Sequence, residues 1–228
     1  MQLSVDDGRF ERKFVVNESR WTEIILWMQN HPLKFNRSYA SRMINSLYFD
    51  SIDYEAYNLN VSGISRRSKL RLRWYGEELS PTDANMELKL RRNELGWKIS
   101  NKVSNLPSFS STLWHDIACH LGRSLDPYLG TMMATYSRPV LICRYHREYF
   151  ESTCRRVRLT IDTQHSALDQ RFTMQPNIQV FAVVPSPVII ELKYPKHDRK
   201  IGDNAAYNLP ARGSRHSKYV VSLYNMIS

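Results

Sequence analysis

Apolar and polar residues alternate with a period of two along several short stretches of the chain. This period places successive side chains on opposite faces of an extended strand. β-branched and aromatic residues are frequent in the same stretches, and Gly76, Gly96 and Pro185 lie between some of them as turn signals. The pattern predicts eight strands, at residues 9–16, 44–49, 69–75, 86–92, 140–151, 156–162, 178–184 and 188–194.

Helical periodicity is confined to a few segments, and Gly122 separates the second from the third. The predicted helices are residues 19–30, 108–121, 126–136 and 217–227. No repeat, low-complexity tract or linker divides the sequence. Eight strands with few long connections favour a closed or nearly closed antiparallel β-barrel. We therefore expect an α+β fold in which a single domain spans residues 1–228 and the helices pack outside a β-barrel tunnel.

The balance of charge points to an anionic partner. The 32 lysine and arginine residues outnumber the 22 aspartate and glutamate residues, which gives a formal net charge of +10. Nucleic acid, acidic lipid and phosphorylated small molecules all carry charge of the required sign. The basic residues alternate along strands instead of clustering on one helix or in a tail, and there is no RNP or zinc-finger pattern. We therefore expect no nucleic-acid partner.

Cysteine content and apolar segments bear on the compartment. Cys119, Cys143 and Cys154 are odd in number and show no CxxC spacing, so the simpler interpretation is a reducing compartment without a disulfide framework. The N-terminal residues contain no apolar signal-peptide core, and the longest apolar stretches are too short to cross a bilayer. We expect a cytoplasmic protein without direct membrane insertion.

Charged residues share one face of each of five predicted strands. The alternating positions are almost all arginine, lysine or glutamate, whereas ordinary solvated faces mix in serine, threonine, asparagine and glutamine. A Glu-x-Lys pair recurs in three of these strands. The residues on the charged faces are Glu11, Lys13, Lys69, Arg71, Arg73, Glu87, Lys89, Arg91, Arg156, Arg158, Thr160, Asp162, Glu191 and Lys193.

A half-exposed sheet with a wet polar face is the plain interpretation of any one of these strands. If all the faces point into a barrel, each unpaired buried cation would cost on the order of several kcal/mol. Such a lumen is tenable when it holds water or a polyanion, and arginine and lysine side chains suit several phosphates. The chain has only 8 glycines and neither GxGxxG nor GxxxxGK[ST], so side chains would hold the phosphates. Carboxylates suit Mg²⁺ or Mn²⁺.

Eight segments, in their order along the chain, resemble the VTC domain. This domain is the catalytic module of vacuolar-transporter-chaperone polyphosphate polymerases and belongs to the triphosphate tunnel metalloenzyme (CYTH-like) superfamily. The segments are FERKFVV (10–16), SLYFDS with the trailing DYEAY (46–57), SKLRLRWYG (68–76), MELKLRR (86–92), RPVLICRYHREYF (138–150), RVRLTIDT (156–163), IIELKYP (189–195) and HSKYVVSLY (216–224). They span nearly the whole chain, and the resemblance implies that the charged faces point into a tunnel.

The resemblance also implies roles for individual residues. The catalytic residues that line the tunnel and hold phosphates would be Lys13, Arg71, Arg73, Lys89, Arg147, Arg158 and Lys218. Further substrate phosphate-binding residues would be Lys69, Arg91, Lys193, Tyr75 and Tyr219. The main metal ligand, for Mn²⁺ or Mg²⁺, would be Glu191, with Glu11 and Glu87 as second candidates.

The reaction that the resemblance implies is metal-dependent transfer of the γ-phosphoryl group of ATP to a growing polyphosphate chain. The alternatives are a tunnel triphosphatase acting on tripolyphosphate or nucleoside triphosphates, and a non-catalytic polyphosphate- or nucleotide-binding domain. Related hydrolases begin with ExExK, and Arg9 stands at the first of these glutamates, which disfavours hydrolysis. The chain shows neither the SPX region nor the transmembrane helices of the eukaryotic polymerases, so the resemblance does not imply coupling to translocation or control by inositol pyrophosphates. A membrane-protein partner is compatible with it.

Overall fold

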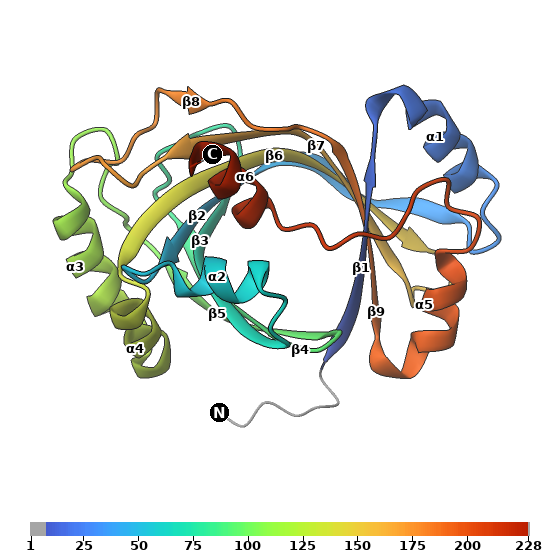
Figure 1. The fold of residues 1–228 in the computed structure, drawn as a ribbon, viewed down its shortest axis with the longest axis horizontal. Helices are drawn as coiled ribbons and strands as arrows, with labels where there is room; N and C mark the ends of the chain where they lie inside the picture. The colour runs from blue at the N-terminus through green and yellow to red at the C-terminus, as the bar shows by residue number, and fades with distance from the viewer. Residues whose placement is uncertain (1–7, 228) are drawn as a thin grey trace.

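The computed structural model describes residues 8–227. The sequence-based expectation about a signal peptide concerns residues 1–14, of which residues 1–7 lie outside the described residues. Within the described residues, nine antiparallel strands form one sheet that closes in a ring (Figure 1). The strands are β1 (Arg9–Val16), β2 (Phe35–Asp50), β3 (Arg66–Tyr75), β4 (Ala84–Arg92), β5 (Leu95–Val103), β6 (Arg138–Ser152), β7 (Arg158–Asp169), β8 (Phe181–Ala182) and β9 (Val188–Pro195). The expected α+β fold with a ring of antiparallel strands is confirmed.

One seam of the ring is short. Around the ring the strands follow the order β6-β2-β3-β4-β5-β1-β9-β7, and β7 pairs with β6 to close it, while β8 extends from β7. Among the described residues, β1 and β5 are paired only where Arg9 meets Gly96 and Phe10 meets Leu95. Further along β1, the connection to the last helix takes the place of β5, because the Ser214 N–H donates to the Lys13 carbonyl at 2.8 Å.

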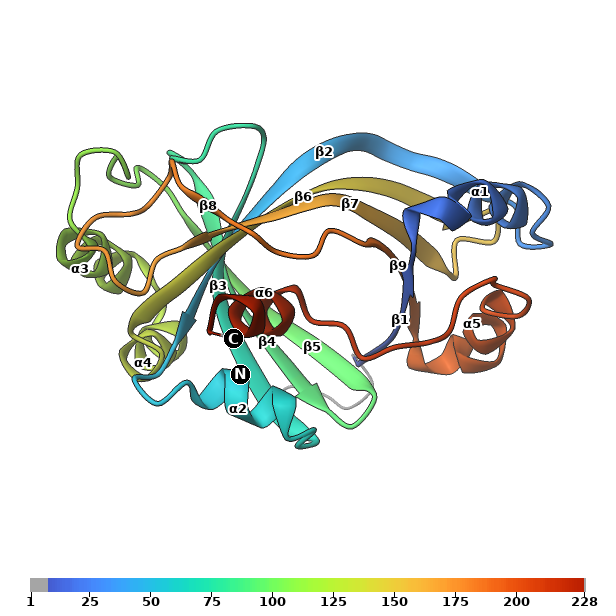
Figure 2. The same cartoon turned by 45° about the horizontal axis from the view of Figure 1, so that its top comes forward.

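Helices cover the apolar faces of the strands. The α-helices within residues 8–227 are α1 (Trp21–Gln29), α2 (Glu55–Val61), α3 (Trp114–Ser124), α4 (Pro127–Thr135), α5 (Arg199–Ala205) and α6 (Lys218–Ile227). One core, which includes Leu72 and Leu121, joins α3 and α4 to β2–β5, and a second, which includes Phe14 and Ile24, joins α1 and α5 to β1, β7 and β9. These two helix pairs lie outside opposite sides of the ring (Figures 1 and 2). Burial of the apolar faces against helices turns the charged faces inward.

The helix α6 lies across one opening of the ring (Figure 2). Its Tyr219 and Leu223 pack with Leu141 and Cys143 of β6 in a third apolar cluster. The Tyr219 hydroxyl donates to the Asp50 carboxylate at 2.5 Å. No helix in the part of the chain that the structure describes is long and apolar enough to cross a membrane.

Several predicted boundaries need correction. Residues 178–184 were predicted as a strand, but only the two residues of β8 are extended, because the Asn177 side chain accepts hydrogen bonds from the Gln179 and Val180 N–H groups and forms a turn. Gly122 does not separate two helices: α3 continues through it to Ser124. The strand β2 begins nine residues before the predicted 44–49, because its polar first half is held by pairing with β6 rather than by an apolar face.

Three elements carry no sequence signal strong enough to predict them. Gly96 reads as a turn signal in the sequence but lies inside the strand β5, whereas the turn is at Asn93, whose φ is 56°. The helix α2 is capped from outside, since the Asp50 carboxylate accepts from the Ala56 N–H at 2.8 Å. The helix α5 contains Gly202, where an added Cβ would lie 2.2 Å from the Tyr194 ring, so glycine permits close helix-to-strand packing.

Candidate functional site: a basic cavity inside the ring

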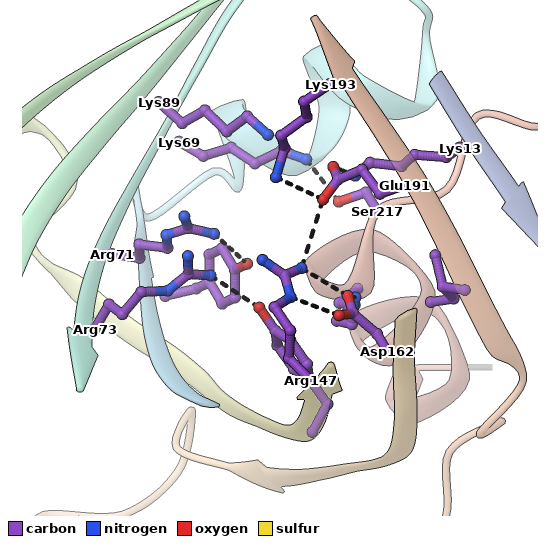
Figure 3. A pocket seen from close by; sticks show the side chains of 14 residues that line it. Lys13, Lys69, Arg71, Arg73, Lys89, Arg147, Asp162, Glu191, Lys193 and Ser217 are labelled. Carbon is purple, nitrogen blue, oxygen red and sulfur yellow. Dashed lines mark hydrogen bonds and ion pairs between the residues drawn. The ribbon is translucent and has the colours of Figure 1, made fainter. Parts of the chain in front are cut away.

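A cavity inside the ring is lined mainly by charged side chains. The empty space between its atoms, part of which opens to solvent, is about 590 Å³. Figure 3 shows side chains from opposite walls directed at this common space. In the described chain, eight basic residues line it: Lys13, Lys69, Arg71, Arg73, Lys89, Arg147, Lys193 and Lys218. The rest of the lining is Tyr48, Tyr145, Asp162, Ile189, Glu191 and Ser217.

Two arginines of β3 lie at one end of the cavity. Arg71 donates through Nε and Nη2 to the same oxygen of Glu87, at 2.9 and 2.7 Å. Arg73 is 9% exposed and donates to the Tyr145 hydroxyl at 3.0 Å. The pKa of Tyr145 is lowered: burial alone would raise it, but Arg147, Arg73 and the lysine of α6 outweigh that effect. The positive charges near Tyr145 therefore stabilise the ionised form of its hydroxyl more than burial opposes it.

Arg147 of β6 forms a buried, doubly hydrogen-bonded ion pair in the cavity. It binds Asp162 through two parallel hydrogen bonds of 2.6 and 2.7 Å, and its Nη2 lies 3.5 Å from Glu191. Lys218, the first residue of α6, reaches the same aspartate at 2.5 Å. Burial would raise the pKa of Asp162, but Arg147 and Lys218 outweigh it and hold the pKa below its usual range. The aspartate fixes both cations in place.

Four lysines form the other end of the cavity (Figure 3). Lys13 Nζ lies 3.1 Å from Glu11 and 3.5 Å from Glu191, and Lys193 lies 2.7 Å from Glu191. Lys89 binds Glu11 at 2.7 Å. The fourth, Lys69, has a hydroxyl partner in place of a carboxylate and donates to Ser217 at 2.6 Å.

Lys69 and Lys89 lie directly opposite each other on β3 and β4. Like charges in this position repel each other. Burial and neighbouring cations lower the pKa of Lys69, and burial, opposed in part by Glu11, lowers the pKa of Lys89 to about 8. A bound polyanion would favour the charged form of both amines and raise both pKa values.

We predict that binding of a polyanion is coupled to proton uptake by this lysine pair. Lys89 is charged in the free protein below pH 8 and loses its proton as the pH rises through about 8, whereas in the complex its pKa is higher. Affinity should therefore fall as the pH rises above 8. Calorimetric titration of long-chain polyphosphate, whose internal phosphates stay ionised, in buffers of different ionisation enthalpy measures the uptake. Lys89→Arg keeps the positive charge over this pH range and should reduce the number of protons taken up on binding. Proton uptake equal to that of the wild-type protein would contradict the prediction.

Three carboxylates of the site were expected to bind a metal. Glu11 and Glu191 are neighbours that share Lys13, whereas Glu87 is held apart by Arg71 and by Lys98 at 2.9 Å. Burial would raise the pKa of each of these carboxyls, but the surrounding cations lower all three. The adjacent pair, Glu11 and Glu191, is the one placed to share a cation.

Four of the residues expected to bind phosphate lie outside the cavity lining, as do the metal candidates Glu11 and Glu87, which contact lysines and arginines of the lining. Arg158 is on the same face of β7 as Asp162, but it is at the strand's first residue, where its side chain is 59% exposed and pairs with Glu151 at 3.2 Å. Tyr219 faces the apolar cluster under α6, and Tyr75 is 44% exposed beyond the end of the cavity. The fourth, Arg91, borders a neighbouring pocket and donates to the carbonyl of its own turn, at Asn93.

Among the lining residues without a site role assigned from the sequence are Asp162, Tyr48 and Ser217. Asp162 shares the charged face of β7, and that alternation was the available signal; its pairing with Arg147 depends on the neighbouring strand. Tyr48 lies on β2 among apolar residues, and Ser217 precedes α6 in a segment without periodicity. For these two, no local pattern distinguishes a lining residue from a packing residue.

Comparisons with known proteins agree with the fold. A family model described as "VTC domain" matches residues 8–227. Among curated protein sequences, none matches the chain significantly. Two solved structures are similar to this chain. One is HpAC1 from Hippeastrum, described as an adenylyl cyclase candidate with a dominant triphosphatase activity; it is 13% identical, with a TM-score of 0.54 over 94% of each chain. The other is an adenylate cyclase candidate from Vibrio parahaemolyticus; it is 10% identical, with a TM-score of 0.52 over 95% of this chain and 98% of that one.

Proposed function

This chain belongs to the VTC domain family, whose model covers almost all of it, and we propose that it is a polyphosphate polymerase. In this proposal, the γ-phosphoryl group of ATP passes to the end of a growing polyphosphate chain inside the basic cavity. The observation that carries the proposal is the cavity itself, in which basic side chains from six different elements converge. Phosphoryl transfer requires in-line positioning and charge neutralisation more than covalent chemistry, and such a lining supplies both.

The arginine end suits the phosphoryl group in transit. Arg71, Arg73 and Arg147 are held by hydrogen bonds before any substrate enters, so their charges are already oriented toward the cavity. Preorganised donors of this kind stabilise the charge that spreads over the equatorial oxygens in the transition state. The lysine end, with mobile ammonium groups, suits the repeating phosphates of the polymer.

The protonation states of the carboxylates favour transfer to phosphate over hydrolysis. An acceptor phosphate is already anionic at neutral pH and needs no general base, whereas an attacking water must lose a proton. The pKa values of Glu11, Glu87, Asp162 and Glu191 are all lowered, because the cations around them outweigh burial and, at Glu11, the repulsion from Glu191. Carboxylates with such low pKa values are weak bases for activating water.

A divalent cation, Mn²⁺ or Mg²⁺, would be held by Glu191 together with Glu11. In proteins Mg²⁺ is commonly bound by one or two carboxylates and by the phosphates of the substrate, which fits this adjacent pair. Within residues 8–227, no three His, Cys, Asp or Glu residues gather in a way that could hold a metal by themselves, so substrate phosphates would complete the coordination. When bound, the cation would neutralise charge on the donor phosphates. Lys13 contacts both carboxylates, and this contact would keep the Glu11 and Glu191 side chains oriented toward the bound cation.

A tunnel triphosphatase is the second candidate. The similar structure from Hippeastrum is reported to have a dominant triphosphatase activity, and the two proteins share a fold. A hydrolase and a polymerase with the same cavity would differ in the acceptor, which is water in one and a phosphate chain in the other. The identity of the products therefore separates the two functions.

We predict that the protein, incubated with ATP and Mn²⁺, forms ADP and long polyphosphate. One ADP should be released for each phosphate that enters the polymer. Gel electrophoresis with polyphosphate staining and a parallel assay of free phosphate measure both products. Release of ADP with an equal amount of free phosphate and no polymer would establish the triphosphatase instead. Thermal stabilisation by polyphosphate without any turnover would indicate a non-catalytic binding domain.

A further inference from the structure

Beyond the arginine end of the cavity lies a surface made of aromatic and guanidinium groups. Tyr75 follows Arg71 and Arg73 at a period of two on β3, so it lies on the same face as the cavity arginines. Its side chain is 44% exposed, and the guanidinium of Arg42 lies 4.0 Å from the centroid of its ring. The face that carries the cavity arginines thus continues directly into a partly exposed pair of planar groups, the Tyr75 ring and the Arg42 guanidinium.

Two more tyrosines extend this surface. Tyr149 lies on β6 two residues after Arg147, and its hydroxyl accepts a hydrogen bond from Arg42 Nε at 3.1 Å. The ring of Tyr39 packs edge-on against Tyr149, with centroids 5.9 Å apart, and is 66% exposed. We call Tyr39, Arg42, Tyr75 and Tyr149 the Tyr-Arg platform.

The strand pairing leaves the platform uncovered. The strand β2 pairs with β3 only from Ile44 to Phe49, so within the described chain its first half has β6 as its single strand partner. The β2–β6 register shifts twice in this half, between Arg37 and Tyr39 and again between Tyr39 and Arg42. Among residues 8–227, Arg42 makes no ion pair with a carboxylate, and its contacts are with the rings of Tyr75 and Tyr149. Its charge remains available to a ligand.

We propose that the Tyr-Arg platform binds the base of a nucleoside triphosphate whose phosphates occupy the cavity. The proposal rests on the proposed function, since it takes the triphosphate to be bound at the arginine end. Same-face residues of a strand are about 7 Å apart, which places Tyr75 roughly 7 Å from Arg73 and about twice as far from Arg71 along β3. This spacing matches a ribose and the first phosphates lying between a base at the platform and a terminal phosphate among the arginines.

The chemistry of the platform favours a base over phosphate. A phosphate chain is repelled by the negative faces of tyrosine rings, whereas every base has a flat π-face that stacks on tyrosine and on guanidinium groups. Stacking of this kind accepts all bases and is stronger for larger rings. Purine triphosphates should therefore bind more tightly than pyrimidine triphosphates, without an absolute choice of base.

The test compares a ligand that has a base with one that has none. A non-hydrolysable ATP analogue and tripolyphosphate are titrated calorimetrically, with Mg²⁺, into the wild-type protein and into Tyr75→Leu. The matched control is Tyr128→Leu, because Tyr128 is 50% exposed and lies on α4, outside the ring. Tyr75→Leu should lower the affinity for the ATP analogue by about tenfold and leave the affinity for tripolyphosphate unchanged. Arg42→Ala should act in the same direction, and Tyr128→Leu should change neither ligand.

Saturation-transfer NMR supplies a second readout, since adenine protons should receive saturation from the wild-type protein and much less from Tyr75→Leu. An equal loss of affinity for both ligands in Tyr75→Leu would overturn the proposal that the platform binds a base, because the substitution would then impair phosphate binding in the cavity. Unchanged binding of both would overturn it as well. If tripolyphosphate binds the wild-type protein, both of these results contradict the platform and leave the proposed function standing. If neither ligand binds the wild-type protein, the proposed function and the platform fail together.

Discussion

Glu191→Gln should abolish metal-dependent phosphoryl transfer while leaving polyanion binding intact. Glu191 is 4% exposed and lies within 3.5 Å of Lys13, Arg147 and Lys193. The amide keeps the shape of the side chain but removes the charge on which a divalent cation depends. Loss of metal assistance removes several kcal/mol of transition-state stabilisation, so activity should fall by at least about a hundredfold.

The measurement is the initial rate of ADP and polyphosphate formation at saturating ATP with Mn²⁺. Tripolyphosphate binding without metal should be retained or tightened in Glu191→Gln, because three cations lose a competing anion. Glu148→Gln is the matched control, since Glu148 pairs with Arg37 at 2.7 Å outside the cavity. A Glu191→Gln protein that transfers phosphate at the wild-type rate would refute the assigned role.

Arg147→Met should reduce both the stability and the activity of the protein. Arg147 is 8% exposed, and its removal leaves the buried Asp162 with Lys218 as its remaining cation. Breaking a buried ion pair on one side costs about 3–5 kcal/mol, and we expect the lower end of that range because Lys218 still compensates. Loss of a preorganised donor should also slow transfer by about a hundredfold or more.

Urea unfolding followed by circular dichroism measures the change in stability, and the product assay measures the rate. Arg37→Met is the control: its ion pair has 57% and 22% exposed side chains, so the change should be about 0–1 kcal/mol. Arg147→Lys keeps the charge and loses the two parallel hydrogen bonds, so it should restore much of the stability but little of the activity. A loss below about 1 kcal/mol in Arg147→Met would contradict the buried pair.

Agreement between sequence and structure is best where the signal is local. The bounds of β1 are the predicted ones, and β3, β4, β6 and β9 overlap their predictions closely, because each has an apolar face that helices bury. Agreement fails where an element depends on a partner outside its own segment. The first half of β2 is extended because of β6, and α2 begins where Asp50 caps it.

The sequence by itself determined which charged residues share a face, because a period of two is a property of the extended backbone. Resemblance to the VTC domain added the expectation that these faces point inward, and the cavity between the strands agrees with it. Only the tertiary structure decided how far along the ring each residue lies. Arg158 and Asp162 alternate identically in sequence, yet one is exposed at a strand end and the other anchors Arg147. Strand register and pairing set that difference, and both depend on contacts between residues far apart in the chain.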